Sequence, residues 1–372
     1  MQHEKNEFGL GVIGMGGFGL FASQHFLQIP GTRLVAIAGT NREGAKAAAE
    51  RFGAVLLDSL DELVAHPDVS IVYIATPPFL HYQQALLALQ AGKHVICEKP
   101  LAVTAEQGHE LIRLAAAKKL LMITNLMQRY NPMFERVRQL IDNQLLGLPL
   151  HGYFENYAAD EGLSAGHWFW DRSKSGGIFI EHGVHFFDLF AGWLGHGEVV
   201  AAQSVKRPGT DIEEQVNCTV VYDGGVTVNF YHGFTQPGRM DRQEMRILFE
   251  RGDITLHEWV PTRINIRCLA DEATTRALMD LFPGARLDVS ASYGGSDRNA
   301  RGRHKDMDVW QQVEISYGYD QHKMHLYGEL LRQMFREQTA YLLNPETHRK
   351  ITEENGLQSL LTAIEASRLA RR

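Results

Sequence analysis

Short apolar runs alternate with segments of helical periodicity over the first third of the chain. The apolar runs predict strands at residues 9–16, 32–39, 69–78, 94–100 and 120–125. The intervening segments predict helices at residues 18–27, 41–53, 79–94 and 104–120. Buried strands that alternate with helices are typical of a doubly wound parallel α/β sheet, which we expect for a domain of residues 1–125.

The pattern changes after residue 125, where strand-like runs follow one another directly. Short connections such as 222–225 favour hairpins, so we expect residues 126–372 to form an α+β domain with an open, largely antiparallel sheet. Residues 283–318 are polar and glycine-rich and are predicted to form a long loop. The C-terminal helices could pack back on the first domain. The predicted helices lie at 131–147, 321–343 and 351–370, and the strands at 150–157, 199–206, 214–222, 225–232, 243–250 and 253–258.

Composition narrows the class of protein. The 372 residues are 44% hydrophobic and 22% charged, as in globular chains with room for two domains. The net charge of −7, with no basic block, argues against nucleic-acid partners and a polybasic membrane contact. We see neither a signal peptide nor an apolar run approaching the roughly 20 residues of a membrane helix. Three widely spaced cysteines indicate neither a disulfide framework nor a metal cluster. We therefore expect a cytoplasmic protein with reduced thiols.

A glycine run after the first predicted strand carries the first chemical signal. Gly14, Gly16 and Gly19 satisfy G-x-G-x-x-G, and the run also contains Gly17 and Phe18. Because the run follows a strand and opens a helix, it predicts a Rossmann turn whose backbone approaches a pyrophosphate at the helix N-terminus. A plain structural turn is the alternative. We expect these five residues to bind a dinucleotide.

The end of the second predicted strand distinguishes NAD from NADP. An acidic residue there binds the ribose 2′-hydroxyl, and a cation accommodates a 2′-phosphate. Gly39 occupies the acidic position, and Thr40, Asn41 and Arg42 follow with groups that can donate to a phosphate. This favours NADP slightly, although Glu43 lies close by and Arg42 could be a solvated residue in an enzyme that uses either cofactor.

Two later motifs resemble those of the glucose–fructose oxidoreductase and inositol dehydrogenase family, called Gfo/Idh/MocA. They are Glu-Lys-Pro at 98–100 and Ser-Gly-Gly-Ile-Phe-Ile-Glu-His-Gly-Val-His-Phe-Phe-Asp at 175–188. The resemblance implies an NAD(P)-dependent dehydrogenase or reductase of sugars, cyclitols or related polyols. The family's usual aspartate four residues before the histidine is Glu181 here, which puts transfer of substrate preference in doubt. The residues that match the family pattern are Lys99, Gly176, Gly177, Gly183, His185 and Asp188.

Oxidation of a secondary alcohol needs a base for the hydroxyl proton and a cation for the developing oxyanion. His185 is the candidate base, because histidine titrates near neutrality. Lys99 lies at the carboxyl end of the predicted parallel strand 94–100, where such sheets present residues to a ligand. Glu181 would share a helix face with His185 and orient it or contact substrate, although it could instead pair with an arginine. For Asp188 a structural role is favoured.

Other residues are expected to line the cofactor and substrate sites. The resemblance places Thr76, Pro77, His81 and Glu98 at the cofactor, with a helix cap as the alternative for His81. Arg129 would either line the pocket or tie the two domains together. The segment 165–173 suits a sugar pocket, or else a loop anchored by buried tryptophans, through Trp168, Trp170, Asp171 and Arg172.

The first functional interpretation is therefore NAD(P)-dependent hydride transfer at a sugar or polyol hydroxyl or ketone. A redox-neutral, glycosidase-type use of the cofactor is a second, and a nucleotide-binding regulator without chemistry is a third. Glu-His-Gly-Val-His at 181–185 does not match H-E-x-x-H, so no metal is expected. The open sheet of the second domain predicts a homo-oligomer, a dimer or tetramer.

Overall fold

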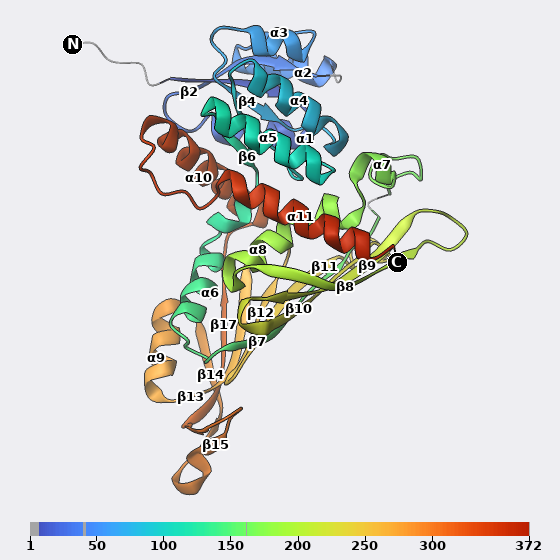
Figure 1. Cartoon of the computed structure of the whole chain (residues 1–372). Coiled ribbons are helices and arrows are strands. Elements are labelled where there is room, and N and C mark those ends of the chain that lie inside the picture. The colour runs from blue at the N-terminus through green and yellow to red at the C-terminus, as the bar shows by residue number, and fades with distance from the viewer. Residues whose placement is uncertain (1–6, 40–41, 161, 372) are drawn as a thin grey trace, which may run out of the picture. The chain divides into compact units, whose positions relative to one another are not determined.

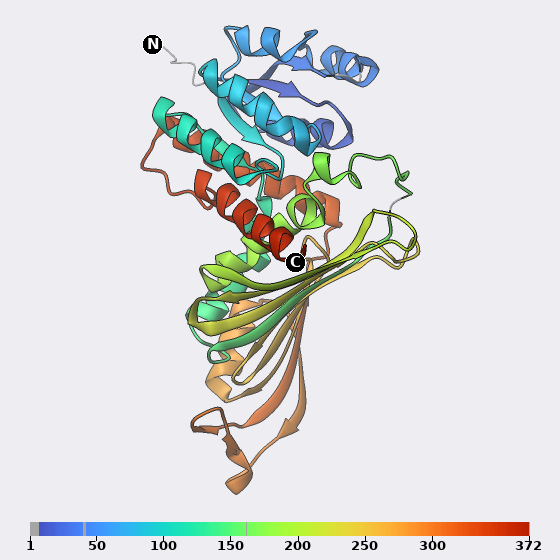
Figure 2. The same cartoon turned by 45° about the vertical axis from the view of Figure 1, so that its right-hand side comes forward.

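A computed structural model describes residues 7–39, 42–160 and 162–371. These residues form two compact units (Figures 1 and 2). The first contains the chain up to Tyr130 together with Ala165–Asp188 and Met324–Ser367, and the second contains the remaining segments. Because each unit combines segments that are distant in the sequence, the single domain boundary expected at residue 125 stays a prediction.

The first unit is built on a six-stranded parallel sheet with the order β3-β2-β1-β4-β5-β6. This confirms the doubly wound α/β fold expected for the N-terminal part. The central strands are fully buried, which is why they read as continuous apolar runs. The strands are β1 (Phe8–Ile13), β2 (Thr32–Ala38), β3 (Val55–Leu56), β4 (Ile71–Ile74), β5 (His94–Cys97) and β6 (Met122–Thr124).

Helices follow most of these strands. The helices α4 and α5 lie side by side in Figure 1, and Thr104 caps α5 by accepting a hydrogen bond from the Gln107 amide. The prediction did not contain α3, whose cap is Ser59. The helices are α1 (Gly17–Phe26), α2 (Arg42–Phe52), α3 (Leu60–Ala65), α4 (Pro78–Gln90), α5 (Ala105–Lys118), α7 (Arg172–Ser175), α10 (Lys323–Leu343) and α11 (Glu353–Leu369).

The second unit is built on a nine-stranded sheet with the order β14-β17-β13-β12-β11-β7-β10-β9-β8. Neighbouring strands are antiparallel except for the parallel pair β7 and β10, which confirms the expected open, largely antiparallel sheet. The hairpin predicted at 222–225 is present, with Gly224 and Gly225 at φ angles of 72° and 78°. The strands are β7 (Pro149–Tyr157), β8 (Gly197–Lys206), β9 (Glu213–Tyr222), β10 (Val226–Gly233), β11 (Arg242–Phe249), β12 (Gly252–His257), β13 (Arg263–Ala270), β14 (Arg286–Ser292) and β17 (Gln311–Gly318).

Helices α6 (Pro132–Asp142) and α9 (Glu272–Leu281) also belong to this unit. Arg136 of α6 lies 4.5 Å from the ring centre of Tyr317 on β17, so the helix packs against the sheet. The sheet is strongly twisted in Figure 2. Among the described residues, no helix is long and apolar enough to cross a membrane.

The long loop predicted for residues 283–318 was wrong. The segment contains β14 and β17, and a small hairpin of β15 (Asn299–Arg301) and β16 (Asp306–Asp308). Strand β17 buries Val313 and Ile315 and exposes Glu314 between them, but this alternation is too short to stand out in a polar segment. Strand β14 lies at the edge of the sheet and is mostly exposed, so its sequence carries little apolar signal.

Candidate active site

The glycine run forms a tight turn between β1 and α1. Gly14 has a φ of 94°, and a Cβ added there would lie 2.5 Å from the Ala75 carbonyl oxygen. A Cβ added at Gly19 would lie 2.0 Å from the Gly14 carbonyl oxygen, so this residue lets helix and strand approach closely. At Gly16 and Gly17 an added Cβ would meet open space. The turn therefore has the compact base and open rim that a pyrophosphate-binding turn needs.

The residues expected to distinguish NAD from NADP are only partly described. Gly39 follows β2, and a Cβ added there would lie 3.6 Å from the Gly14 amide nitrogen. Thr40 and Asn41 lie outside the described residues, and Arg42 is described only as the first residue of α2. The preference for NADP stays a prediction.

Lys99 and Glu181 form the central ion pair of the site. Lys99 follows β5, and Glu181 lies on a short π-helix, η2 (Phe179–Gly183). The Lys99 ammonium donates to Glu181 Oε1 at 2.6 Å and to the Glu181 carbonyl oxygen at 2.7 Å. The side chains are only 20% and 11% exposed, so little water competes for these bonds. Glu181 was expected to orient His185 or contact substrate, or else to pair with an arginine. The structure pairs it with Lys99, and its contact with His185 or substrate stays a prediction.

His185 lies at the beginning of α8 (Val184–Leu194) and is buried. Burial lowers the pKa of His185 well below its ordinary value, and Lys99 and His182 lower it further. Burial thus favours the neutral ring of His185, which has one nitrogen able to accept a proton. This is the form that a general base requires.

Arg129 lies on the short helix η1 (Met127–Tyr130) and pairs with Asp188 of α8. Its Nε and one terminal nitrogen donate to the two carboxylate oxygens at 2.8 and 2.9 Å. That terminal nitrogen also donates to the Asp188 carbonyl oxygen at 3.1 Å. Burial raises the pKa of Asp188, although Arg129 and Asn355 lower it. Both residues are therefore in a buried structural pair, the role favoured for Asp188.

Glu98 is held inside the unit beside Lys99. Its Oε1 accepts from the Tyr73 hydroxyl at 2.6 Å and from the Asn125 amide at 2.7 Å. Burial raises the pKa of Glu98, although these bonds and Lys99 lower it.

The sequence did not indicate Tyr327 of α10, whose ring centre lies 5.5 Å from that of Phe18 in the glycine run. The negative charge of Glu98 contributes to raising the pKa of Tyr327, so the two groups interact.

The segment between β4 and α4 begins with Ala75, whose carbonyl oxygen lies next to Gly14 of the glycine turn. Thr76 donates from its hydroxyl to Gln84 at 2.6 Å, and Pro77 is the cap residue of α4. His81 is completely buried, with its two ring nitrogens against the carbonyl oxygens of Thr76 and Pro100. It therefore does not cap the helix through an amide.

The aromatic segment 165–173 has mainly structural contacts. Trp170 is 9% exposed, and its ring centre lies 4.7 Å from that of Phe169. The centres of Trp168 and Phe169 lie 6.3 Å apart. Asp171 caps α7 by accepting from the Ser173 amide, and Arg172 donates to the Ser367 carbonyl oxygen at 3.4 Å. These contacts fit the anchored-loop interpretation, and contact with a sugar stays a prediction.

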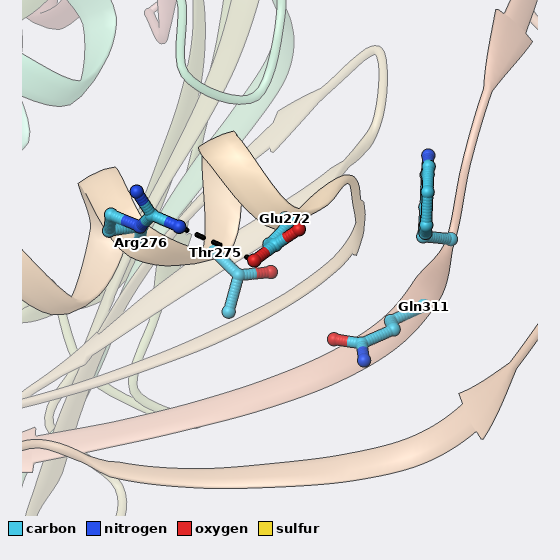
Figure 3. A pocket seen from close by; sticks show the side chains of 5 residues that line it. Glu272, Thr275, Arg276 and Gln311 are labelled. Carbon is cyan, nitrogen blue, oxygen red and sulfur yellow. Dashed lines mark hydrogen bonds and ion pairs between the residues drawn. The ribbon is translucent and has the colours of Figure 1, made fainter.

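Figure 3 shows a pocket in the second unit, beside the first turn of α9. It holds about 290 Å³, and none of the predicted site residues lines it. Across the described ranges, no group of three or more histidine, cysteine, aspartate or glutamate side chains is arranged to hold a metal ion. The pocket in Figure 3 is lined by Glu272, Thr275, Arg276, Trp310 and Gln311.

Known proteins similar to this chain include several sugar and polyol oxidoreductases. D-xylose 1-dehydrogenase (NADP(+)) from Hypocrea jecorina is 48% identical over 90 residues, 24% of this chain and 23% of that protein. 1,5-anhydro-D-fructose reductase from Ensifer adhaerens is 31% identical over 56% of this chain and 64% of that protein. Inositol 2-dehydrogenase from Rubrobacter xylanophilus is 30% identical over 44% and 49%. The chain thus matches less than two thirds of the length of each.

Solved structures have the same fold over nearly the whole chain. Levoglucosan dehydrogenase, in complex with NADH and levoglucosan, has a TM-score of 0.77 at 20% identity and covers 98% of this chain and 97% of its own. Biliverdin reductase from Synechocystis, in complex with biliverdin and NADP⁺, has a TM-score of 0.71 at 18% identity, over 98% and 99%. At these identities the likeness shows the fold alone.

Two family models match the chain. The first, described as an oxidoreductase family with an NAD-binding Rossmann fold, matches residues 8–126. The second, the GFO/IDH/MocA C-terminal domain, matches residues 134–255. Together they cover more than half of the sequence. The first match spans the strands of the parallel sheet, and the second spans part of the nine-stranded sheet. This chain belongs to the Gfo/Idh/MocA oxidoreductase family.

Proposed function

We propose that this protein is an NAD(P)-dependent oxidoreductase that interconverts a secondary hydroxyl and a ketone of a sugar, cyclitol or related polyol. The observation that carries the proposal is the largely buried ion pair of Lys99 with Glu181, because Glu181 lies on the same motif as the buried His185. The similarity to xylose and inositol dehydrogenases and to an anhydrofructose reductase supports this substrate class.

The residues of the glycine turn fit a dinucleotide. Its open rim at Gly16 and Gly17 and the uncapped N-terminus of α1 would hold the pyrophosphate. When bound, the nicotinamide supplies the chemistry of hydride acceptance and donation. Thr76, Pro77, His81 and Glu98 are proposed to lie at the cofactor, and Thr40, Asn41 and Arg42 to favour NADP slightly.

Lys99 and His185 are proposed to act on the reacting oxygen. The Lys99 ammonium would stabilise negative charge on that oxygen by donating a hydrogen bond. His185 would accept the hydroxyl proton during oxidation and return it during reduction. Glu181 would hold the ammonium in place through its carboxylate and its backbone carbonyl.

Two other proposals concern alternatives and assembly. A redox-neutral reaction on the same site would leave tightly bound cofactor in the purified protein. A regulator would bind the cofactor without turnover. We also propose a homo-oligomer, a dimer or tetramer, through the nine-stranded sheet.

The first experiment tests cofactor and substrate together. The purified protein is checked for co-purified nucleotide and then titrated with NADH and NADPH by fluorescence. Turnover is measured with D-xylose, inositol and 1,5-anhydro-D-fructose as probes. We expect nicotinamide binding and turnover that Lys99→Ala reduces by about 100-fold or more. Lys118→Ala on α5 is the matched control. Normal turnover in Lys99→Ala would contradict the proposed role of the ammonium.

A further inference from the structure

His81 makes two close contacts that one neutral histidine cannot satisfy. The residue is on α4 and is completely buried. Its Nδ1 lies 2.7 Å from the Pro100 carbonyl oxygen, and its Nε2 lies 2.7 Å from the Thr76 carbonyl oxygen. A carbonyl oxygen only accepts hydrogen bonds, whereas a neutral imidazole has only one N–H. With a neutral ring, one nitrogen lone pair would face an oxygen lone pair at hydrogen-bond distance.

The charges around His81 act in opposite directions. Burial has the largest influence and lowers the pKa of His81, and the Lys99 ammonium lowers it too. The hydrogen bonds to the two carbonyl oxygens and the Glu181 carboxylate raise the pKa. Together these influences lower the pKa of His81, so what favours the doubly protonated ring is the geometry of its contacts: each ring nitrogen lies at hydrogen-bond distance from an oxygen that can only accept.

One carbonyl oxygen belongs to Thr76, next to the glycine turn, and the other belongs to Pro100, next to Lys99. Thr76 leaves β4 beside the glycine turn, where an added Cβ at Gly14 would meet the Thr76 amide nitrogen at 2.9 Å. Pro100 follows Lys99 directly in the chain, so the bond to Pro100 restrains the backbone next to Lys99. His81 thus connects the backbone at Thr76, next to the glycine turn, to the backbone at Pro100, next to Lys99.

We infer that His81 carries a proton on both ring nitrogens and, by donating to Thr76 and Pro100, acts as a positioning residue for Lys99. The functional part of this inference rests on the proposed reaction. The protonation of the ring and the placement of Lys99 do not, and they are measurable without a substrate.

The protonation is tested by NMR on the full-length protein with ¹⁵N-labelled histidine. At pH 8, where histidines with an ordinary pKa near 6.5 are neutral, we expect one histidine with both ring nitrogens in the N–H range, and its signals should be absent from His81→Phe. The matched control is His94→Gln, which removes a histidine from β5 but keeps an acceptor for the Leu121 amide. A bare nitrogen on His81 at pH 8 would overturn the double protonation.

The positioning role is tested by acetic anhydride labelling of Lys99, read by mass spectrometry. If His81 holds the backbone beside Lys99, His81→Phe should label Lys99 at least about 10-fold faster, because a displaced ammonium loses its buried bonds. His94→Gln should label as the wild type does. Equal labelling in His81→Phe would overturn the positioning role. If the phenylalanine variant does not fold, His81→Leu removes the same pair of bonds with a smaller side chain that cannot donate.

The reaction gives a third measurement for any probe sugar that is turned over. His81→Phe should lower kcat by about 100-fold with little change in the KM for the cofactor, since a misplacement of about 1 Å costs about this much. Unchanged kcat would contradict the positioning role. Absence of turnover in the wild type would instead contradict the proposed function, and leave the NMR and labelling results to decide on His81.

Discussion

The ammonium of Lys99 lies 2.6 Å from a carboxylate oxygen of Glu181, and it also donates to the backbone carbonyl of the same residue. One residue on a π-helix thus holds, through its side chain and its backbone carbonyl, a lysine that follows a strand of the parallel sheet. Because the pair is mostly shielded from water, losing one partner leaves a charge with poor solvation. The first prediction follows from this arrangement.

Glu181→Gln should reduce kcat/KM by about 100-fold, since a neutral amide holds the ammonium in place less firmly than a carboxylate does. The measurement is steady-state kinetics with the best probe sugar, for both single variants and the double variant with Lys99→Ala. If the residues act as one unit, the double variant should be no worse than Lys99→Ala alone. Fully additive losses would contradict a shared role.

The second prediction concerns stability at low pH. Burial lowers the pKa of His182 to about 3, and it lowers the pKa of His185 well below 6.5. Between these lowered values and about 6.5, the unfolded chain binds more protons than the folded chain. The free energy of unfolding should therefore fall as the pH drops below about 6.5, by up to about 1.4 kcal/mol per pH unit for each histidine.

Urea unfolding between pH 7 and pH 4 measures this slope. His182→Gln should remove part of it, whereas the exposed His109 on α5 provides the control variant His109→Gln. A slope that is the same in wild type and His182→Gln would mean that this histidine does not contribute.

The third prediction concerns Arg129 and Asp188. Asp188→Ala should lower the free energy of unfolding by about 3–5 kcal/mol, because it leaves a buried guanidinium without its carboxylate. The double variant Arg129→Met with Asp188→Leu should be less destabilised than Asp188→Ala, since no buried charge remains. Chemical denaturation checks both, and a double variant less stable than the single one would contradict this account.

The sequence predicts most of the first unit because its strands are buried on both faces and alternate with helices. The strands β14 and β17 escaped prediction for the opposite reason. One is an exposed edge strand, and the other buries only alternate residues such as Val313 and Ile315. Two-residue β3 is too short to give any apolar pattern.

For the candidate site, motifs identify residues but not their partners. The Lys99 and Glu181 motifs lie about 80 residues apart, and only the fold shows that these side chains bond to each other. The sequence could not predict that Tyr327 lies beside Phe18, because this contact requires α10, near the end of the chain, to pack on α1. The paired contacts of His81 depend on backbone carbonyls, which sequence patterns do not describe.

The last prediction separates the two kinds of glycine in the turn. Gly14→Ala should destabilise the fold by about 1–3 kcal/mol, because its φ of 94° is strained for alanine and the added Cβ would meet the Ala75 carbonyl. Gly17→Ala has open space for its Cβ, and its helical position favours alanine, so the melting temperature should not fall. If the open rim binds a pyrophosphate, however, that methyl group would lie where the phosphates approach, and the affinity for NADPH or NADH should drop at least about 10-fold. Thermal unfolding without ligand and fluorescence titration with each nucleotide measure the two effects on the same samples. Unchanged nucleotide affinity in a fully folded Gly17→Ala would show that the rim of the turn is not the phosphate site.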